Sequence, residues 1–395
     1  MTDCARVILK RGEEKDIFAG HLWVYDNEVA RIDGKTEDGG FVDVVAFNGV
    51  FLGRGYINSK SRILVRIMTR EREEINREFL KKRIENAFIY REKLMFGENP
   101  RSAYRAVFGE ADYLPALIVD KFADCYVIQT LSLGIDLMKS DIVDIIKEYC
   151  NPRCIYERND VPLREKEGLL QQKGTLYGTS PGIVEIEENG VRLLVDIENG
   201  QKTGYFLDQR ENRASIAPYV RGAEVLDCFC HTGGFALHAA KFGAKAVEAV
   251  DVSDKALEFV TKNAQLNGFE NITVKNANVF DLLNAYQLEG RMFDTVILDP
   301  PAFCKTKSAL SGAYRGYKEI NLRGMKLVRR GGFLITCSCS HYMTPELFMK
   351  MLQDAAIDSR RAVRISEIRY QAKDHPISIN ADESLYLKYV AIQIM

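Results

Sequence analysis

The sequence lacks any hydrophobic run long enough to cross a membrane, since no window of about 18 residues is apolar and uncharged throughout. Residues 1–6 include charged side chains and lack the apolar stretch of a signal peptide. The nine cysteines are an odd number in a chain without an export signal, which is typical of free thiols in a reducing compartment. We therefore expect a cytoplasmic protein with no membrane partner.

Two common kinds of site are also missing. No cysteine has partner histidines at the spacing of a zinc site, so we expect no metal and interpret these thiols as structural: Cys150, Cys154, Cys228, Cys230 and Cys304. The chain has no G-x-G-x-x-G segment, which argues against a dinucleotide site. A net charge of −1 gives no overall preference for a polyanionic partner.

The pattern of apolar and turn residues divides the chain into three regions. Residues 1–72 contain short strands broken by glycine, which predicts a small β-rich domain. Residues 73–190 mix helices and strands, which predicts an α+β domain. Residues 191–395 alternate strand and helix, which predicts a doubly wound α/β domain.

The first two regions are expected to contain strands over 5–9, 41–46, 50–56, 63–67, 117–120, 126–131 and 183–186, and helices over 73–95 and 136–149. In the last region we expect strands over 224–228, 246–252, 272–276, 293–298, 332–338, 364–371 and 386–394. The helices expected there cover 234–242, 255–266 and 345–356.

Polar residues follow the strands of the α/β region, where sheets of this kind bind ligands. The first strand ends in Asp227 and leads into Thr232-Gly233-Gly234, whose glycines allow a ligand to approach the backbone. The second strand ends in Asp251, which is suited to accept hydrogen bonds from a ribose. Asn278 and Asp281 follow the third strand and are placed to bracket an adenine.

The segment Asp299-Pro300-Pro301 ends the strand over 293–298. Two prolines form a stiff extended turn that cannot continue a sheet. They hold the Asp299 carboxyl at the sheet edge, where it can hydrogen-bond a flat nitrogenous base. With the preceding glycine turn, this order predicts a methyltransferase that uses S-adenosylmethionine. A capping aspartate before a proline-rich turn is the structural alternative.

Cys339 follows the strand over 332–338 and therefore lies at the same sheet edge. Carbon 5 of cytosine is a poor nucleophile, and a thiolate that adds at carbon 6 activates it for methylation. Asp299 is suited to interact with nitrogen 3 of the same ring. We interpret Cys339 and Asp299 as candidate catalytic residues. From placement alone, a small buried core residue is an equal interpretation of Cys339, and Cys337 is expected to be one.

Residues 301–330 carry eight basic side chains against one acidic side chain, Glu319. Basic groups interleaved with aromatic residues suit a phosphate backbone with unstacked bases. We therefore expect RNA contacts from Lys305, Arg315, Tyr317 and Lys318. A solvated helix face is the alternative for any such run.

Five segments match a family of RNA-modifying enzymes. They are residues 201–210, 227–235, 299–301, 315–318 and 337–340. On these segments the chain resembles the three-domain 23S ribosomal RNA cytosine-5 methyltransferases, and the resemblance covers essentially its whole length. It implies an N-terminal PUA domain over 1–72, a central domain over 73–190 and a class I, Rossmann-like methyltransferase domain over 191–395.

The resemblance implies S-adenosyl-L-methionine as the cofactor, large-subunit ribosomal RNA as the partner and Cys339 as the nucleophile. It also places residues 201–210 over the methionine end of the cofactor. The residues expected to bind the cofactor are Lys202, Tyr205, Asp208, Arg210, Asp227, Thr232, Gly233, Gly234, Asp251, Ser253, Asn278, Asp281, Asp299 and Pro300. The sequence does not fix the oligomeric state, and a homodimer is one alternative.

One departure concerns the second cysteine of other cytosine-5 RNA methyltransferases, which directly follows their Asp-x-Pro motif and helps to release the product. Here Ala302 and Phe303 intervene before Cys304. Either release uses another base, or the chain does not methylate carbon 5 of cytosine. Two alternatives stay open: an RNA purine N-methyltransferase that uses Asp-Pro-Pro, and an RNA-binding factor with an inactive methyltransferase domain.

Overall fold

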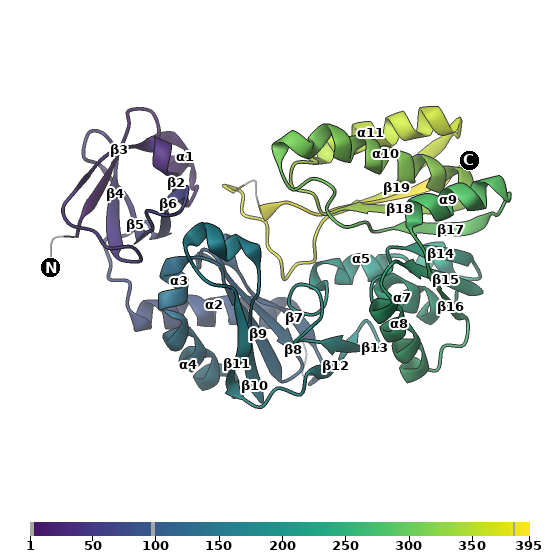
Figure 1. Ribbon diagram of the computed structural model, residues 1–395, viewed down its shortest axis with the longest axis horizontal. Helices are drawn as coiled ribbons and strands as arrows, with labels where there is room; N and C mark the ends of the chain where they lie inside the picture. The colour runs from purple at the N-terminus through teal and green to yellow at the C-terminus, as the bar shows by residue number, and fades with distance from the viewer. Residues whose placement is uncertain (1–3, 96–98, 382–383) are drawn as a thin grey trace. The chain divides into compact units, whose positions relative to one another are not determined.

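The computed structural model describes residues 4–95, 99–381 and 384–395. The chain forms two compact units (Figure 1). Unit 1 consists of Met1–Ile186, Val195–Leu207 and Lys373–Ser384, and unit 2 of Glu187–Leu194, Asp208–Ala372 and Leu385–Met395. None of the helices in these described ranges is sufficiently long and apolar to cross a bilayer.

A six-stranded sheet occupies the start of unit 1, in the order β2-β6-β5-β4-β1-β3. The predicted strands correspond to β1 (Arg6–Leu9), β4 (Phe41–Val45), β5 (Phe51–Ile57) and β6 (Ile63–Thr69). The prediction missed β2 (Trp23–Tyr25), β3 (Val29–Asp33), helix α1 (Glu14–Ala19) and the 3-10 turn η1 (Asp26–Glu28). These elements are short, and β3 is a largely exposed edge strand without an apolar alternation.

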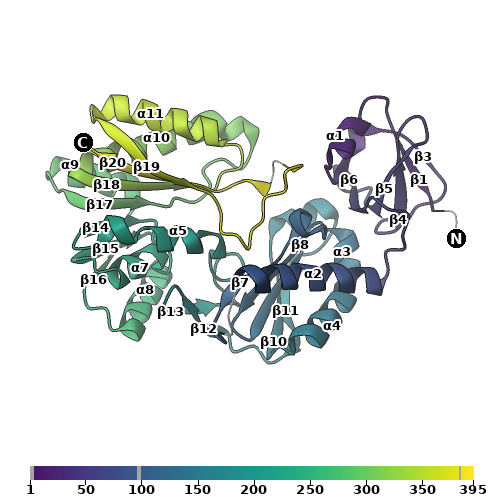
Figure 2. The same cartoon turned by 180° about the vertical axis from the view of Figure 1, so that it is seen from behind.

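A five-stranded sheet follows in unit 1, in the order β11-β10-β9-β8-β7. Its strands are β7 (Ala103–Phe108), β8 (Leu117–Phe122), β9 (Cys125–Thr130), β10 (Cys154–Asn159) and β11 (Gln172–Gly178). Helices α2 (Arg77–Met95), α3 (Leu133–Leu137) and α4 (Lys139–Cys150) accompany it (Figure 2), with 3-10 turns η2 (Gly109–Asp112) and η3 (Pro162–Glu167). Strands β7, β10 and β11 were not predicted.

A segment from near the C-terminus completes this part of unit 1. The backbone carbonyl of Asp374 accepts a hydrogen bond of 2.8 Å from the Arg91 guanidinium, and its carboxylate accepts one of 2.9 Å from the Arg105 amide. Arg91 is fully buried and also pairs with Asp112 at 2.6 Å. The segment around Asp374 is therefore tied to the sheet by buried polar contacts, and buried polar groups need such partners to be stable.

Strands β12 (Ile183–Glu188) and β13 (Val191–Asp196) form a two-stranded sheet whose residues are divided between the two units. The domain boundary expected near residue 190 falls in this hairpin. The division into three domains at residues 72 and 190 stays a prediction.

Unit 2 contains a seven-stranded sheet in the order β16-β15-β14-β17-β18-β20-β19. Strands β14 (Glu224–Cys228), β15 (Ala246–Asp251), β16 (Ile272–Asn276), β17 (Phe293–Leu298) and β18 (Val328–Ser338) are parallel. Strand β20 (Lys388–Ile394) is antiparallel to both β18 and β19 (Val363–Arg369). The chain order reverses at β14, so the predicted doubly wound α/β fold is confirmed.

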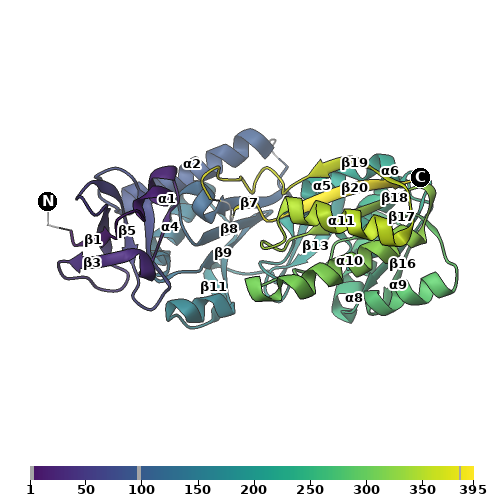
Figure 3. The same cartoon turned by 90° about the horizontal axis from the view of Figure 1, so that it is seen from above.

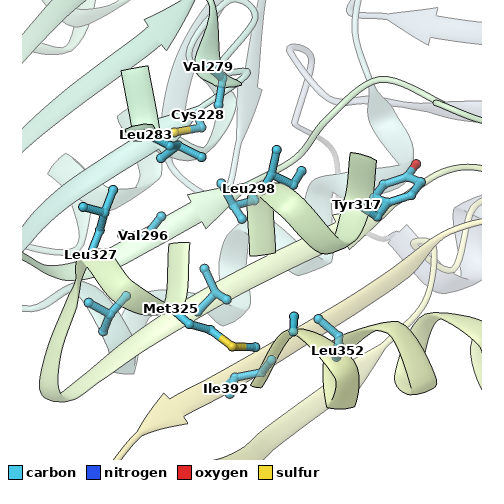
Figure 4. Close-up of a cluster of buried hydrophobic side chains, with 14 of the residues drawn as sticks. Cys228, Val279, Leu283, Val296, Leu298, Tyr317, Met325, Leu327, Leu352 and Ile392 are labelled. Carbon is cyan, nitrogen blue, oxygen red and sulfur yellow. The ribbon is translucent and has the colours of Figure 1, made fainter. Parts of the chain in front are cut away.

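Helices cover both faces of this sheet (Figure 3). One face packs against α6 (Ala217–Val220), α7 (Gly234–Lys241) and α8 (Asp254–Asn267), preceded by η4 (Leu207–Gln209) and α5 (Arg210–Ser215). The other face packs against α9 (Val279–Leu288), α10 (Leu310–Leu327) and α11 (Pro345–Ser359), with η5 (Lys307–Ala309) before α10. Figure 4 shows the apolar cluster on this second face.

Successive strand residues contribute to opposite cores because side chains alternate across a sheet. Val225 packs in the cluster with α7 and α8, whereas Leu226 packs in the cluster with α9 and α10. This is why strands buried on both faces have continuous apolar sequences. Helices α9 and α10 were not predicted, and α10 contains four of the eight basic residues over 301–330.

A buried ion pair connects the start of unit 2 to its helices. Arg213 on α5 donates two hydrogen bonds, of 2.6 and 2.9 Å, to Glu188, and both side chains are almost fully buried. Burial would raise the pKa of Glu188, but the Arg213 guanidinium outweighs it and holds this pKa below its usual value. His238 on α7 lies 3.6 Å from the same carboxylate.

Arg213→Met is expected to lower the free energy of unfolding by about 3–5 kcal/mol, because Glu188 would keep a buried charge without its main partner. Chemical denaturation followed by circular dichroism measures this change. The matched control is Arg329→Met, which removes two partly exposed ion pairs, with Asp294 and Glu224, and is expected to cost about 1 kcal/mol or less. Equal losses in the two variants would contradict the prediction.

Candidate active site

In the loop after β14, three residues have positive φ angles, although only one of them is a glycine. Phe229, His231 and Gly233 have positive φ angles of 62°, 51° and 88°. A Cβ atom on Gly233 would lie 3.2 Å from Val260, so glycine suits both the angle and the space. The loop ends at Gly234, the first residue of α7, whose early amide groups have no partner within the helix. This arrangement lets a ligand approach the backbone closely.

The Asp251 carboxylate at the end of β15 braces this loop. It accepts hydrogen bonds from the His231 amide at 2.9 Å and from the Ser253 amide at 3.0 Å. Ser253 in turn caps α8 by accepting a bond from the Ala256 amide. A carboxylate has about four acceptor positions, so Asp251 retains capacity for a ribose hydroxyl.

The end of β16 leads into α9, where Asn278 is the N-cap residue. Its side chain accepts a hydrogen bond from the Phe280 amide at 2.9 Å. Asn278 and Asp281 are both exposed at the start of α9. Both therefore lie at the carboxyl edge of the sheet, as expected.

Asp299 at the end of β17 is held by a residue that precedes α5. Gln209 donates a hydrogen bond of 2.9 Å to the Asp299 carboxylate, and Gln209 is itself positioned by a bond of 2.7 Å from Asn212. Desolvation and the nearby Asp208 carboxylate raise the pKa of Asp299 to about 7. Asp299 is therefore partly protonated near neutral pH and can donate as well as accept a proton.

Two further carboxyl groups lie near Asp299 and repel negative charge. Asp227 is fully buried, and burial together with the charges of Asp299 and Asp251 raises its pKa well above the usual value. Asp208 accepts a hydrogen bond of 2.6 Å from the Tyr386 hydroxyl. The other carboxylate oxygen of Asp208 is buried and has no hydrogen-bond partner within the described residues. A cationic ligand would relieve this accumulation of acidic groups.

The structure brings Cys339 next to the Asp-Pro-Pro turn. The Cys339 thiol donates to the Pro300 carbonyl at 3.9 Å and is partly exposed. Cys337, two residues earlier, is fully buried in the core, and burial raises its pKa well above the usual value. Of the two thiols at the end of β18, only Cys339 is thus accessible to a substrate.

Ser340 ties together the loops that follow β17 and β18. Its hydroxyl accepts a hydrogen bond from the Cys304 amide at 3.1 Å and lies 2.9 Å from the Tyr317 hydroxyl. The Cys304 thiol is buried and donates to the Thr306 carbonyl at 3.2 Å. These contacts fix Cys339 between the Asp-Pro-Pro turn and α10.

The expectation that Tyr317 contacts RNA is wrong, because its side chain is buried. Tyr317 is fully buried, and its ring packs against Phe303 and Phe348 with centroids 4.6 and 6.1 Å apart. A ring enclosed in this way has no free face on which a base could stack. Its basic neighbours differ: Lys305 and Arg315 are exposed, and Lys318 is partly buried and pairs with Asp358 at 2.6 Å.

Not all predicted cofactor residues lie in unit 2. Lys202, with a positive φ of 56°, and the buried Tyr205 belong to unit 1, in which Thr203 donates a hydrogen bond of 2.6 Å to Asp120. Arg210 begins α5 in unit 2 and is buried. Their roles stay predictions.

The sequence interpretation missed Gln209, Tyr386 and Lys388, which support Asp299, Asp208 and the Cys339 loop. Gln209 lies inside the family-matching segment 201–210, and that segment is the signal by which the sequence indicates it. Lys388 is buried at the start of β20 and donates to the Ser340 carbonyl at 2.7 Å. Nothing in the local pattern around Tyr386 or Lys388 marks either residue.

Comparisons with known proteins agree with this geometry. Residues 7–70 match a PUA-like domain family, and residues 174–368 match a family described as S-adenosylmethionine-dependent methyltransferase. A Shewanella amazonensis protein named ribosomal RNA large subunit methyltransferase I is 44% identical over 393 residues, covering 98% of this chain and 99% of that protein.

Two solved structures share the fold over the whole chain. One is a candidate S-adenosylmethionine-dependent methyltransferase from Streptococcus mutans, with a TM-score of 0.84, and the other is a candidate methyltransferase complexed with S-adenosylhomocysteine, with a TM-score of 0.86. Each is 21% identical and covers 99% of this chain and 100% of its own.

The cofactor of the chain is S-adenosylmethionine, and the residues present fit it. The cofactor carries positive charge on its sulfonium and amino groups. The Asp208 oxygen that has no hydrogen-bond partner among the described residues is buried, and Asp208 lies near the Asp299 carboxyl. Asp208, the loop around Gly233 and Asp251 would hold the cofactor.

Gly233→Ala is expected to weaken S-adenosylmethionine binding by about tenfold or more, because the added Cβ strains the positive φ and displaces the loop. Isothermal titration calorimetry measures the dissociation constant. Gly243→Ala is the matched control, since Gly243 has a similar φ of 87° but open space around its Cβ position. The control should lose stability without losing affinity, and unchanged affinity in Gly233→Ala would contradict the assignment of the loop.

Proposed function

Because the chain belongs to the ribosomal RNA large subunit methyltransferase I family, we propose that it forms 5-methylcytosine in large-subunit (23S) ribosomal RNA through a covalent adduct with Cys339. The observation that carries this proposal is the position of Cys339 on the Pro300 carbonyl, directly beside Asp299. This arrangement places a thiol and a carboxyl group at one sheet edge, where a flat base can reach both.

The role proposed for the Cys339 thiol is to activate carbon 5 of cytosine for methylation. Carbon 5 of cytosine is too weak a nucleophile to accept a methyl group directly. Addition of the Cys339 thiolate at carbon 6 moves electron density to carbon 5. S-adenosylmethionine supplies the methyl group as an electrophilic carbon on a sulfonium.

Asp299 supports this step through its proton. Because its pKa is raised to about 7, the carboxyl group is partly protonated at neutral pH and can donate to nitrogen 3 of cytosine. A proton at nitrogen 3 makes carbon 6 more electrophilic and favours thiolate addition. This contribution is present below the raised pKa and is lost as the pH rises above it.

A second candidate is methylation of a purine nitrogen, which an Asp-Pro-Pro turn also suits. It is favoured by the position of Cys304, whose buried thiol donates to the Thr306 carbonyl. In the cytosine-5 reaction, release therefore requires a base other than Cys304. The product decides between the two candidates, because only the cytosine reaction needs a thiol.

Cys339→Ala is expected to lower formation of 5-methylcytosine by roughly a thousandfold or more, since it removes the nucleophile. Binding of S-adenosylmethionine should remain, because the thiol lies at the base side of the site. Mass spectrometry of nucleosides from reacted large-subunit RNA measures the product. Cys337→Ala, two residues earlier on the same strand, is the matched control and should lose stability while it retains activity. Full activity of Cys339→Ala would remove the covalent mechanism, and a methylated purine in the wild-type product would favour the second candidate.

The exposed side chains of Lys305 and Arg315 are the proposed RNA phosphate contacts beside this site. Replacing both by glutamine is expected to weaken RNA binding and to lower the slope of log affinity against log salt by about one to two, because each phosphate contact releases counterions. Binding at several salt concentrations measures the slope. Lys350→Gln on α11, which removes another exposed lysine, serves as the control. An unchanged slope in the double variant would identify the basic run as a solvated helix face.

A further inference from the structure

Lys388 is a buried cation with unusual partners. It is the first residue of β20, is 3% exposed and pairs across the sheet with Ser338 of β18. Its ammonium group donates hydrogen bonds of 2.7 Å to the Ser340 and Tyr386 carbonyls. Within the described residues, no carboxylate forms an ion pair with it. A fully buried lysine is rare without a charged partner.

Lys388 contacts the two residues that flank Cys339 in the sequence. Ser338 and Ser340 flank Cys339 in sequence, and Lys388 contacts the backbone of both. The ammonium group and the Cys339 sulfur interact electrostatically, and this interaction favours the charged lysine. The backbone contact with Ser340 and the pairing with Ser338 therefore hold the Lys388 side chain near the candidate nucleophile.

Other titratable groups near this pair come from several elements. Tyr317 on α10 hydrogen-bonds Ser340, and burial raises its pKa to about 12, so it stays neutral. Cys337 on β18 is held neutral by burial. Asp299 and Asp208 contribute the negative charge nearby, and both act on Cys337. Among these groups, Lys388 is the one that can stabilise a thiolate.

We propose that Lys388 is the ion-pair partner that converts the Cys339 thiol into the nucleophilic thiolate, an inference that rests on the proposed function. The proton moves from the Cys339 sulfur to the neutral Lys388 amine, and the electrons of the S–H bond stay on sulfur. The thiol–amine and thiolate–ammonium forms contain the same number of protons, so no further reactant is needed. When the carbon 6–sulfur bond breaks, its electron pair returns to sulfur and the same ammonium group stabilises it.

The acidity of Lys388 suits this exchange. Desolvation lowers its pKa to about 8, and the charge of Cys339 opposes part of that decrease. A neutral amine is therefore accessible slightly above neutral pH. Lys388 acts through Cys339, so it is a positioning residue.

The experiment measures the ionisation of Cys339 in the full-length chain without the methylation reaction. Iodoacetamide alkylates thiolates, and peptide mass spectrometry follows the rate at Cys339 as a function of pH. In Lys388→Met, the pH midpoint of alkylation is expected to rise by about one unit or more, because the cation is lost. Lys388→Arg keeps the charge and is expected to keep a low midpoint. Methyl transfer at neutral pH should fall about tenfold or more in Lys388→Met, with little change in KM for S-adenosylmethionine.

Lys388→Gln provides a second neutral variant that keeps a donor for the backbone carbonyls, and it replaces Lys388→Met if that variant does not fold. Circular dichroism and cofactor titration establish the fold of each variant. A wild-type alkylation midpoint in a folded neutral variant would overturn the proposal. Full methylation activity in Cys339→Ala would instead overturn the proposed function, while the alkylation midpoints would still report whether Lys388 ionises Cys339.

Discussion

The hydrogen bonds of Ser340 hold the two loops that define the chemistry of unit 2. One loop contains Asp299 and two prolines, and the other contains Cys339. Each loop leaves a parallel strand at the same sheet edge, but parallel neighbours alone do not fix the distance between loops. Ser340 does so by contacting the Cys304 amide, the Tyr317 hydroxyl and the Lys388 ammonium. The apolar core around Tyr317 thereby supports the reactive edge.

Burial of the carboxyl groups at this sheet edge raises their pKa values. Desolvation raises the pKa values of Asp227 and Asp299, and the charge of Asp299 adds to the shift of Asp227 as the charge of Asp208 adds to that of Asp299. The Arg213 guanidinium lowers both values but is already paired with Glu188. A cation bound beside these carboxyl groups would favour their ionised forms, which suits a cationic cofactor. Titratable groups with such shifts commonly mark functional sites.

The sequence predicted the strands of unit 2 far better than its helices. Strands β14, β16 and β17 match their expected ranges because their apolar and β-branched residues are bounded by charged or turn residues. Helix α10 was missed because its basic residues were interpreted as a charge run. Its buried residues Ala313, Tyr317, Ile320, Gly324 and Leu327 recur at intervals of three or four, which is the helical signal.

The residues of the candidate site also divide into those that the sequence could predict and those that it could not. Asp299 and Cys339 follow recognisable strands, so their common edge could be predicted from order alone. The place of Lys388 could not, because its contact with Ser340 spans 48 residues and depends on the antiparallel pairing of β18 with β20. For Tyr317 the sequence was misleading. Its aromatic ring among basic residues suggested a surface position, whereas its place in the helical repeat of α10 puts the ring in the core.

The assignment of residues 373–384 to unit 1 affects how the chain is made. During synthesis, the five-stranded sheet leaves the ribosome long before the residue that satisfies Arg91 and Arg105. Arg91 is fully buried, so its guanidinium lacks one of its acceptors until Asp374 has emerged. Unit 1 therefore cannot complete its native hydrogen bonds as an isolated N-terminal fragment. Its final consolidation therefore waits until nearly the whole chain has been made.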